Sequence, residues 1–195
     1  MVARTSQIIS KTSIPGLLVI QRPVYSDNRG FFHEIFRLNE LEGALGVAFR
    51  PVQASHSLSL PRVIRAIHTE GWNKLIYPVT GKMFTAIVDV RPKSKTFGRV
   101  ETFTFDNTKK DSPHSAVFIA KGLGNSLCVA GEEPVDYVYL VDEYWDDKKA
   151  QGIAWDDPDL NIKWPVKNPI ISDRDRNNST LREIYPEKFT PTPKG

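Results

Sequence analysis

Alternation of hydrophobic and polar residues over short stretches dominates this chain. The clearest case is residues 100–105, Val-Glu-Thr-Phe-Thr-Phe, in which apolar and polar side chains follow one another. Such alternation places the two kinds of side chain on opposite faces of a β-strand. Runs rich in β-branched and aromatic residues predict further strands at residues 17–21, 31–36, 75–79, 83–90, 115–119 and 137–141.

Turn residues separate these runs at short intervals. Examples are Asp27-Asn28-Arg29-Gly30, Thr80-Gly81-Lys82 and Gly122-Leu123-Gly124. Helical periodicity is scarce, and we expect short helices at residues 38–45 and 146–151. Many short strands with turns between them predict an all-β sandwich, jelly roll or barrel.

Composition and length fit one globular domain, which we place at residues 1–185. The chain has 195 residues, 40% of them hydrophobic, and we expect residues 186–195 to form a mobile tail. The net charge of +3 is spread along the chain, which argues against nucleic acid as a partner. No run reaches the roughly 18 apolar residues of a membrane span, so we expect no membrane partner. With one cysteine, Cys128, and no visible secretory leader, we expect a cytoplasmic protein.

Candidate chemistry is concentrated in residues 65–74, Arg-Ala-Ile-His-Thr-Glu-Gly-Trp-Asn-Lys. This stretch places the imidazole of His68 and the amine of Lys74 six positions apart, between strand-like runs. An imidazole can take or give a proton near neutral pH. An amine nearby can stabilise the negative charge that proton removal creates. The pair therefore indicates proton transfer next to a carbonyl group.

The stretch belongs to a longer pattern that covers most of the chain, roughly residues 14–175. Its parts are Asp27-x-Arg29-Gly30-x-Phe32-x-Glu34, Gln53-x-Ser55, Arg65-x-x-His68 with Lys74, Tyr139, and Ser172-x-x-Asp175. In this order and spacing the chain resembles the dTDP-4-dehydrorhamnose 3,5-epimerase family. The resemblance implies a cupin-like double-stranded β-helix (jelly roll) that needs no metal and no cofactor. It also implies a homodimer that acts on a nucleotide-linked 4-keto-6-deoxy sugar.

The resemblance further implies a role for each matching residue. His68 matches the general base and Asp175 the carboxylate that orients it, Lys74 the cation at the enolate oxygen, and Tyr139 the acid on the opposite face. The substrate-binding positions match Arg29, Phe32, Glu34, Gln53, Ser55 and Arg65. The family also implies that the segment from Arg29 to Glu34 reaches the site of the partner subunit, so that two chains share each site.

Several positions depart from the family pattern and leave the substrate open. Ser55 stands where the family has an asparagine, and Ala66-Ile67 replaces Gly-Leu. In a later glycine-rich segment, the family has a histidine where this chain has Asn125. Inversion at C3, at C5 or at both remains open. Alternatives are a 3-epimerase or ketoisomerase for another substrate, such as a GDP-linked keto sugar, and a non-catalytic carbohydrate-binding cupin. His68-x-Glu70 lacks the second histidine of a metal-binding cupin, which leaves too few ligands for zinc or iron.

Overall fold

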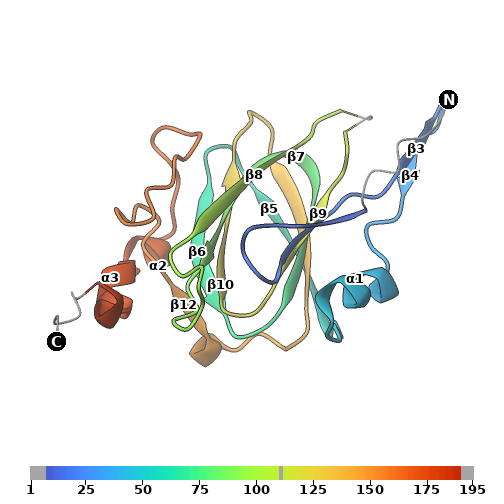
Figure 1. Cartoon of the computed structure of the whole chain (residues 1–195). Coiled ribbons are helices and arrows are strands. Elements are labelled where there is room, and N and C mark those ends of the chain that lie inside the picture. The colour runs from blue at the N-terminus through green and yellow to red at the C-terminus, as the bar shows by residue number, and fades with distance from the viewer. Residues whose placement is uncertain (1–7, 110–111, 190–195) are drawn as a thin grey trace.

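The computed structural model describes residues 8–109 and 112–189 and shows two antiparallel sheets packed face to face (Figure 1). The strands are β1 (Ile9–Lys11), β2 (Leu17–Ile20), β3 (Val24–Asp27), β4 (Gly30–His33), β5 (Gln53–Ser59), β6 (Ile64–Glu70), β7 (Lys74–Asp89), β8 (Val100–Asn107), β9 (Ala116–Ile119), β10 (Leu123–Val129), β11 (Val135–Val141) and β12 (Ala150–Gly152). The α-helices are α1 (Leu38–Leu45), α2 (Asp173–Arg176) and α3 (Leu181–Ile184), and the 3₁₀ helices are η1 (Asp147–Lys149) and η2 (Pro186–Lys188).

The long strand β7 belongs to both sheets. Its first half pairs with β9 and β11, and its second half pairs with β8 and β10. One sheet therefore has the order β1-β2-β9-β7-β11-β5, and the other has the order β8-β7-β10-β6-β12. This arrangement is the expected cupin-like jelly roll.

The turn expected at residues 80–82 is wrong, because β7 continues through it. Gly81 has φ +80°, and a Cβ at this position would lie 2.4 Å from the carbonyl oxygen of Pro134. The glycine therefore serves a close approach of two backbones at the point where β7 changes partners. This explains why two predicted strands, 75–79 and 83–90, are one.

Of the other turn and helix predictions, the turn at residues 122–124 is correct in part, one helix is confirmed and one helix is wrong. The turn expected at residues 122–124 ends early, because β10 begins at Leu123. Gly124 lies inside that strand, where a Cβ would come within 2.8 Å of the Ile67 side chain. The helix expected at residues 38–45 is confirmed by α1, whereas the one at 146–151 is wrong: one 3₁₀ turn, η1, is followed by the short strand β12.

Three groups of buried side chains stabilise the sandwich. The first lies between the sheets and includes Leu17, Ile76 and Val117. The second and third cover the outer faces of the two sheets. Residues after β12, together with α3, cover the sheet that contains β6, and α1 packs against the other sheet through buried Leu41. Both outer faces are therefore covered. Polar side chains that point between the sheets face solvent at the place where the sandwich opens.

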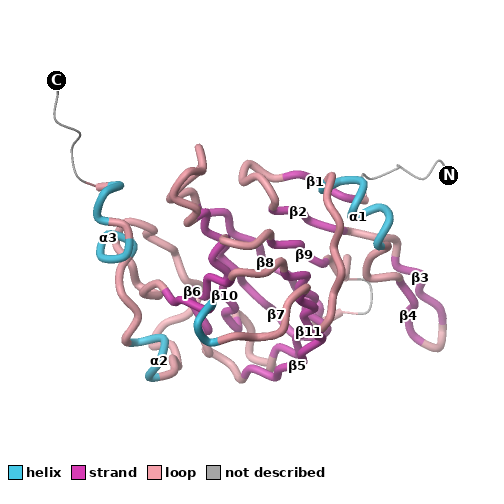
Figure 2. The backbone as a smooth tube through the Cα atoms, turned by 90° about the horizontal axis from the view of Figure 1, so that it is seen from below, coloured by secondary structure: helices cyan, strands magenta, loops and turns pink. Residues whose placement is uncertain are grey.

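The hairpin β3–β4 stands apart from the sandwich. It forms a separate two-stranded sheet and projects at the end opposite α2 and α3 (Figure 2). Tyr25 and Phe32 on this hairpin are 64% and 67% exposed. Large exposed aromatic side chains on a projecting hairpin indicate a contact surface.

The chain end is ordered for longer than the expected tail boundary at residue 185. Pro186–Lys188 form η2, and the ring of Phe189 packs against Phe97 and beneath the guanidinium of Arg182. Residues 190–195 lie outside the described part of the chain, so the mobile tail stays a prediction there. Across the described ranges, no helix combines the length and the apolar character that crossing a bilayer requires.

Candidate active site

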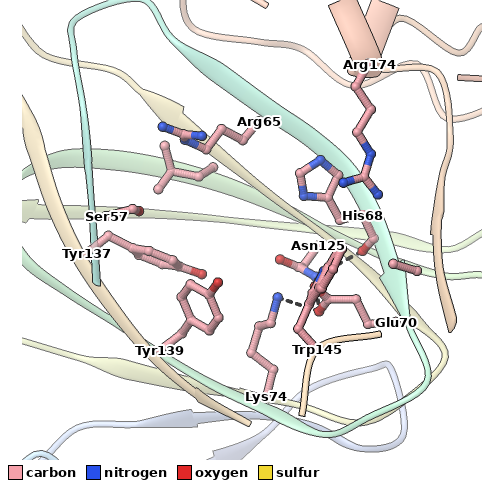
Figure 3. Close-up of a pocket in the computed structure, with 12 residues that line it drawn as sticks. Ser57, Arg65, His68, Glu70, Lys74, Asn125, Tyr137, Tyr139, Trp145 and Arg174 are labelled. Carbon is pink, nitrogen blue, oxygen red and sulfur yellow. Dashed lines mark hydrogen bonds and ion pairs between the residues drawn. The ribbon is translucent and has the colours of Figure 1, made fainter. Parts of the chain in front are cut away.

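Four of the ten predicted site residues, Arg65, His68, Lys74 and Tyr139, line one pocket between the sheets (Figure 3). The cavity volume is about 230 Å³, a little below the roughly 300–1,000 Å³ typical of small-molecule sites, and the mouth is open to solvent, so a ligand that fills the cavity can extend beyond it. The lining residues are Ser57, Arg65, His68, Glu70, Lys74, Asn125, Leu127, Tyr137, Tyr139, Trp145, Ala150 and Arg174.

Strand alternation explains why these side chains share one cavity. His68 and Glu70 are two residues apart on β6, and Tyr137 and Tyr139 are two residues apart on β11. Side chains at such spacing point to the same face of a strand. Lys74 opens β7 and lies on the same inner face as Ile76 of the central core.

An irregularity in β6 brings Arg65 to the same pocket. In the pairing of β6 with β10, Arg65 is opposite Leu127 and His68 is opposite Asn125, so three steps along β6 match two steps along β10. An extra residue of this kind is a β-bulge, which turns a side chain to the other face. Arg65 and His68 therefore both line the pocket although they are three positions apart, a spacing that puts side chains of a regular strand on opposite faces.

His68 is held by a buried carboxylate from a distant part of the chain. Its Nε2 lies 2.9 Å from Oδ1 of Asp175, whose Oδ2 accepts a 3.2 Å bond from the backbone N–H of Ala66. Asp175 is 3% exposed and lies in α2, where its own N–H bonds to the capping hydroxyl of Ser172. The helix cap, the strand and the imidazole together fix the carboxylate.

The environment keeps Asp175 ionised. Burial raises the pKa of its carboxyl, but the His68 hydrogen bond and charge and the Ala66 N–H outweigh that effect and hold the pKa below its usual value. An ionised carboxylate only accepts hydrogen bonds, so His68 donates from Nε2. The lone pair of the neutral imidazole is then on Nδ1, where it can take a proton.

Lys74 is a buried cation, paired with Glu70. Its side chain is 7% exposed, and its Nζ forms an ion pair with Oε2 of Glu70. Burial lowers the pKa of Lys74, whereas the charge of Glu70 and its hydrogen bond act to raise it; the net effect is a lowered pKa. The amide of Asn125 donates to the carbonyl oxygen of His68 at 3.0 Å and to Oε2 of Glu70 at 3.5 Å.

Two tyrosines form the wall opposite His68. The ring centroids of Tyr137 and Tyr139 are 5.5 Å apart, and Nζ of Lys74 lies 4.7 Å from the centroid of the Tyr139 ring. Burial, together with the charge of Glu70, raises the pKa of Tyr137 well above its usual value, so that its hydroxyl stays protonated. The pocket thus presents an imidazole, an ammonium group and two phenols in one cavity (Figure 3).

Cationic and aromatic side chains lie at the mouth. Arg174 extends beside His68, the Arg65 guanidinium points away from His68 toward the side of Ser57 and Tyr137, and Trp145 lies in front of Glu70 (Figure 3). Arg65 donates from Nε to the hydroxyl of Ser59 at 2.9 Å. Guanidinium groups suit phosphate oxygens because their donors match the oxygens in pairs.

Two of the six predicted substrate-binding residues, Gln53 and Ser55, lie on β5 beside the pocket but are not among its lining residues. The Gln53 amide donates to the hydroxyl of Ser55 at 3.0 Å and accepts from the N–H of Trp145 at 3.2 Å. Both side chains are partly exposed. Within one chain, Gln53 thus fixes the loop that carries Trp145.

The other three outlying positions, Arg29, Phe32 and Glu34, lie at the projecting hairpin and far from the pocket of their own chain (Figure 1). The Arg29 guanidinium is 86% exposed and pairs with Asp27. Glu34 accepts from Arg22 at 2.6 Å and from Arg37 at 3.0 Å, which gives this carboxylate a structural role within the chain. Their expected contact with substrate stays a prediction that needs a second subunit.

Three pocket residues that matter chemically were not identified from sequence as site residues. Glu70 was considered solely as a metal ligand, and the strand-like run predicted before His68 did not extend to it, whereas β6 continues to Glu70 and puts both side chains on one face. Tyr137 has the same relation to Tyr139. Arg174 lies among charged residues that read as a surface cluster, and no local signal separates it from Arg176.

The donor set for a metal ion is also sparse. Within residues 8–109 and 112–189, no three His, Cys, Asp or Glu side chains are grouped so that they could hold a metal ion. The Asn125 amide, at the position of a histidine in metal-binding cupins, instead bonds to His68 and Glu70.

Comparison with known proteins identifies a family for the whole sandwich. The family model described as dTDP-4-dehydrorhamnose 3,5-epimerase matches residues 11–183. A relative named dTDP-4-dehydrorhamnose 3,5-epimerase from Shigella flexneri is 34% identical over 173 residues, which cover 87% of this chain and 93% of the relative.

Solved structures agree with this match. NovW, a 4-keto-6-deoxy sugar epimerase from Streptomyces spheroides, superposes with a TM-score of 0.86 and 29% identity over 95% of this chain and 92% of its own. ChmJ, a 3'-monoepimerase from Streptomyces bikiniensis in complex with dTDP-quinovose, superposes with a TM-score of 0.83 and 32% identity over 93% of this chain and 91% of its own. Structures of this fold therefore include enzymes with different extents of epimerisation.

Proposed function

Because the chain belongs to the dTDP-4-dehydrorhamnose 3,5-epimerase family, we propose that it epimerises a dTDP-linked 4-keto-6-deoxy sugar at a carbon next to the keto group. The observation that carries the proposal is the meeting of His68, backed by buried Asp175, with the buried ammonium of Lys74 and the phenol of Tyr139 in one pocket. Each group is of a chemical type that one step of the reaction needs.

The first step is removal of a proton from carbon. His68 takes the proton on Nδ1, and the imidazolium that forms is stabilised by the ionised Asp175 on Nε2. The electron pair moves onto the C4 oxygen, giving an enolate. The ammonium of Lys74 is the group in the cavity suited to stabilise that oxygen.

The second step is return of a proton from the other face of the sugar. An inverted product requires a second acid, because a single group working on one face restores the starting stereochemistry. Tyr139 lies across the pocket from His68 and supports this role. Its ring lies beside Lys74, with Nζ 4.7 Å from the ring centroid.

Arg65 and Arg174 at the mouth support binding of the diphosphate. Both residues line the pocket and both are solvent exposed, so that an incoming nucleotide can reach them. Gln53 and Ser55 lie close enough to line an extension of the same site once a ligand or a second subunit closes it.

The finer statements of the proposal are a homodimer with shared sites and a cytoplasmic location. The exposed Phe32 and Arg29 of the projecting hairpin support the first, since neither contacts the pocket of its own chain. Mixing a His68→Ala variant with a Phe32→Ala variant tests it. Recovery of activity on mixing supports shared sites, and its absence in a mixture shown to exchange subunits contradicts them.

The proposed reaction is tested by incubating the protein with dTDP-linked and GDP-linked 4-keto-6-deoxy sugars in deuterated water. NMR shows which carbons take up deuterium and which epimers form. We expect exchange at C3, at C5 or at both with the dTDP-linked sugar, and none with a His68→Ala variant. Tight binding of every sugar without exchange would instead indicate a carbohydrate-binding cupin, and migration of the keto group to a neighbouring carbon of the sugar ring would indicate a ketoisomerase.

A further inference from the structure

The ion pair between Glu70 and Lys74 differs from the exposed lysine pairs of this chain. The two side chains are 13% and 7% exposed, whereas those of Glu143 and Lys149 are 44% and 52% exposed. An exposed pair contributes little to stability, and a buried charge is costly unless a partner compensates it. A buried pair inside a reaction pocket therefore needs an explanation beyond surface electrostatics.

The surroundings of Lys74 offer one negative partner. Among the described residues that line the pocket, Glu70 is the carboxylate, and the rest of the titratable groups facing Lys74 are His68 on β6 and Tyr137 and Tyr139 on β11. Arg65 and Arg174 at the mouth add positive charge, which disfavours a further cation. Removing the charge of Glu70 would leave Lys74 buried among neutral and positive groups.

The carboxylate is itself held in place. Oε2 of Glu70 accepts both from Nζ of Lys74 and from the amide of Asn125, and the same amide donates to the carbonyl oxygen of His68. Asn125 of β10 thus bonds both to the β6 backbone and to the Glu70 side chain of that same strand, which anchors the carboxylate to the neighbouring strand. One carboxylate oxygen fixes where the ammonium lies, beside the ring of Tyr139.

We propose that Glu70 is a positioning residue that keeps Lys74 in its ammonium form and at a fixed place in the pocket, with Asn125 orienting Glu70. The proposal rests on the proposed function in one respect, namely that the ammonium acts on the C4 oxygen. Its physical basis is independent of the substrate. Burial favours the neutral amine, and the neighbouring carboxylate restores the charge that an enolate requires.

The first test measures Lys74 directly in the protein without substrate. Proteins labelled with ¹³C and ¹⁵N at lysine are titrated by NMR, and the Lys74 signal is assigned by its absence in Lys74→Arg. We expect Lys74 to carry a proton at pH 7 and to lose it at lower pH in Glu70→Gln than in the wild type. Glu143→Gln, which removes the charge from the exposed pair, leaves the Lys74 titration unchanged.

The second test measures the reaction. We expect Glu70→Gln to lower kcat for exchange by about 10- to 100-fold, below the roughly 10²- to 10³-fold cost of losing an oxyanion stabiliser outright. The KM changes by less than about threefold, and the loss grows as pH rises, because a larger fraction of Lys74 becomes neutral. Glu143→Gln keeps the wild-type rate and pH profile.

The outcomes separate the two proposals. A Lys74 titration that is unaltered in Glu70→Gln, or a Lys74 that is already neutral at pH 7 in the wild type, overturns the role of Glu70. A folded Glu70→Gln protein that loses activity equally at every pH also overturns it, since a merely structural role predicts that result. If the wild type exchanges no sugar at all, the proposed function fails, and the titration still decides whether Glu70 controls Lys74.

Discussion

Replacing Asp175 by asparagine tests the chemical centre of the site with almost no change in shape. The carboxylate now accepts from Nε2 of His68 at 2.9 Å and from the Ala66 N–H at 3.2 Å. In Asp175→Asn, the amide oxygen can keep the bond from Ala66, which turns the amide NH₂ toward His68. Because that NH₂ donates, Nε2 must accept, and the imidazole proton moves to Nδ1.

The expected loss follows from this change of tautomer. His68 no longer has a lone pair on Nδ1 to take the proton from carbon, and no anion stabilises the imidazolium. General-base catalysis contributes about 10²- to 10⁴-fold, and the analogous change in a serine protease triad costs about 10⁴-fold. We therefore expect kcat to fall by about 10³- to 10⁴-fold, which corresponds to about 4–5 kcal/mol in activation free energy.

The measurement is the rate of deuterium uptake by the 4-keto sugar, followed by proton NMR. Asp173→Asn is the matched control, because Asp173 is an exposed residue of the same short helix, two positions earlier. We expect the control to keep the wild-type rate. Uptake by a folded Asp175→Asn protein within threefold of the wild-type rate would refute the assignment of His68 and Asp175 as base and orienting carboxylate.

Three further predictions concern the opposite acid, the pH dependence of stability and the backbone of β7. Tyr139→Phe removes the proposed second acid but keeps the ring beside Lys74. We therefore expect deuterium uptake to persist while formation of the inverted product, followed by NMR, falls about 10²-fold or more. Unchanged product stereochemistry and an unchanged rate would assign Tyr139 a structural role. Burial lowers the pKa values of His33 and His114, so unfolding takes up protons and the free energy of unfolding falls as pH drops below about 6.5. The urea midpoints of unfolding at pH 7.5 and pH 5.5 should therefore differ less in His114→Phe than in the wild type. The exposed His56 provides the control variant, His56→Gln. Gly81→Ala should destabilise the protein by about 2–4 kcal/mol, because the new Cβ meets the Pro134 carbonyl. Gly46 also has a positive φ but no atom within 4 Å of a Cβ, so Gly46→Ala should cost about 1 kcal/mol. Equal melting temperatures for the two variants would contradict this interpretation.

Local sequence patterns predicted those parts of the fold that local interactions determine. The alternation at residues 100–105 lies within β8, and the helix expected at 38–45 is α1. Residues 80–82 and 146–151 were misjudged because distant backbone decides both: Gly81 is enclosed by Pro134, and Ala150–Gly152 pair with Glu70, Thr69 and His68 of β6. Turn and helix signals are local, and they do not report such pairing.

The site shows the same division between local and distant determinants. The family pattern identified His68 and Asp175 together, although 107 positions separate them and spacing alone gives no reason to join them. Strand alternation could have placed Glu70 beside His68 from the sequence. The burial of Lys74 could not be predicted in that way, because it depends on β11 and β9, which are distant in sequence and flank the start of β7.

Burial of Lys74 has a consequence for how the pocket discriminates between states of the substrate. An ammonium already paired with Glu70 gains little from a neutral ketone oxygen, since the ion pair must weaken to form the new contact. It gains more from an enolate oxygen, whose full negative charge competes with the carboxylate for the buried ammonium. The Glu70–Lys74 pair thus favours the enolate over the ketone, which is the differential stabilisation that accelerates proton removal.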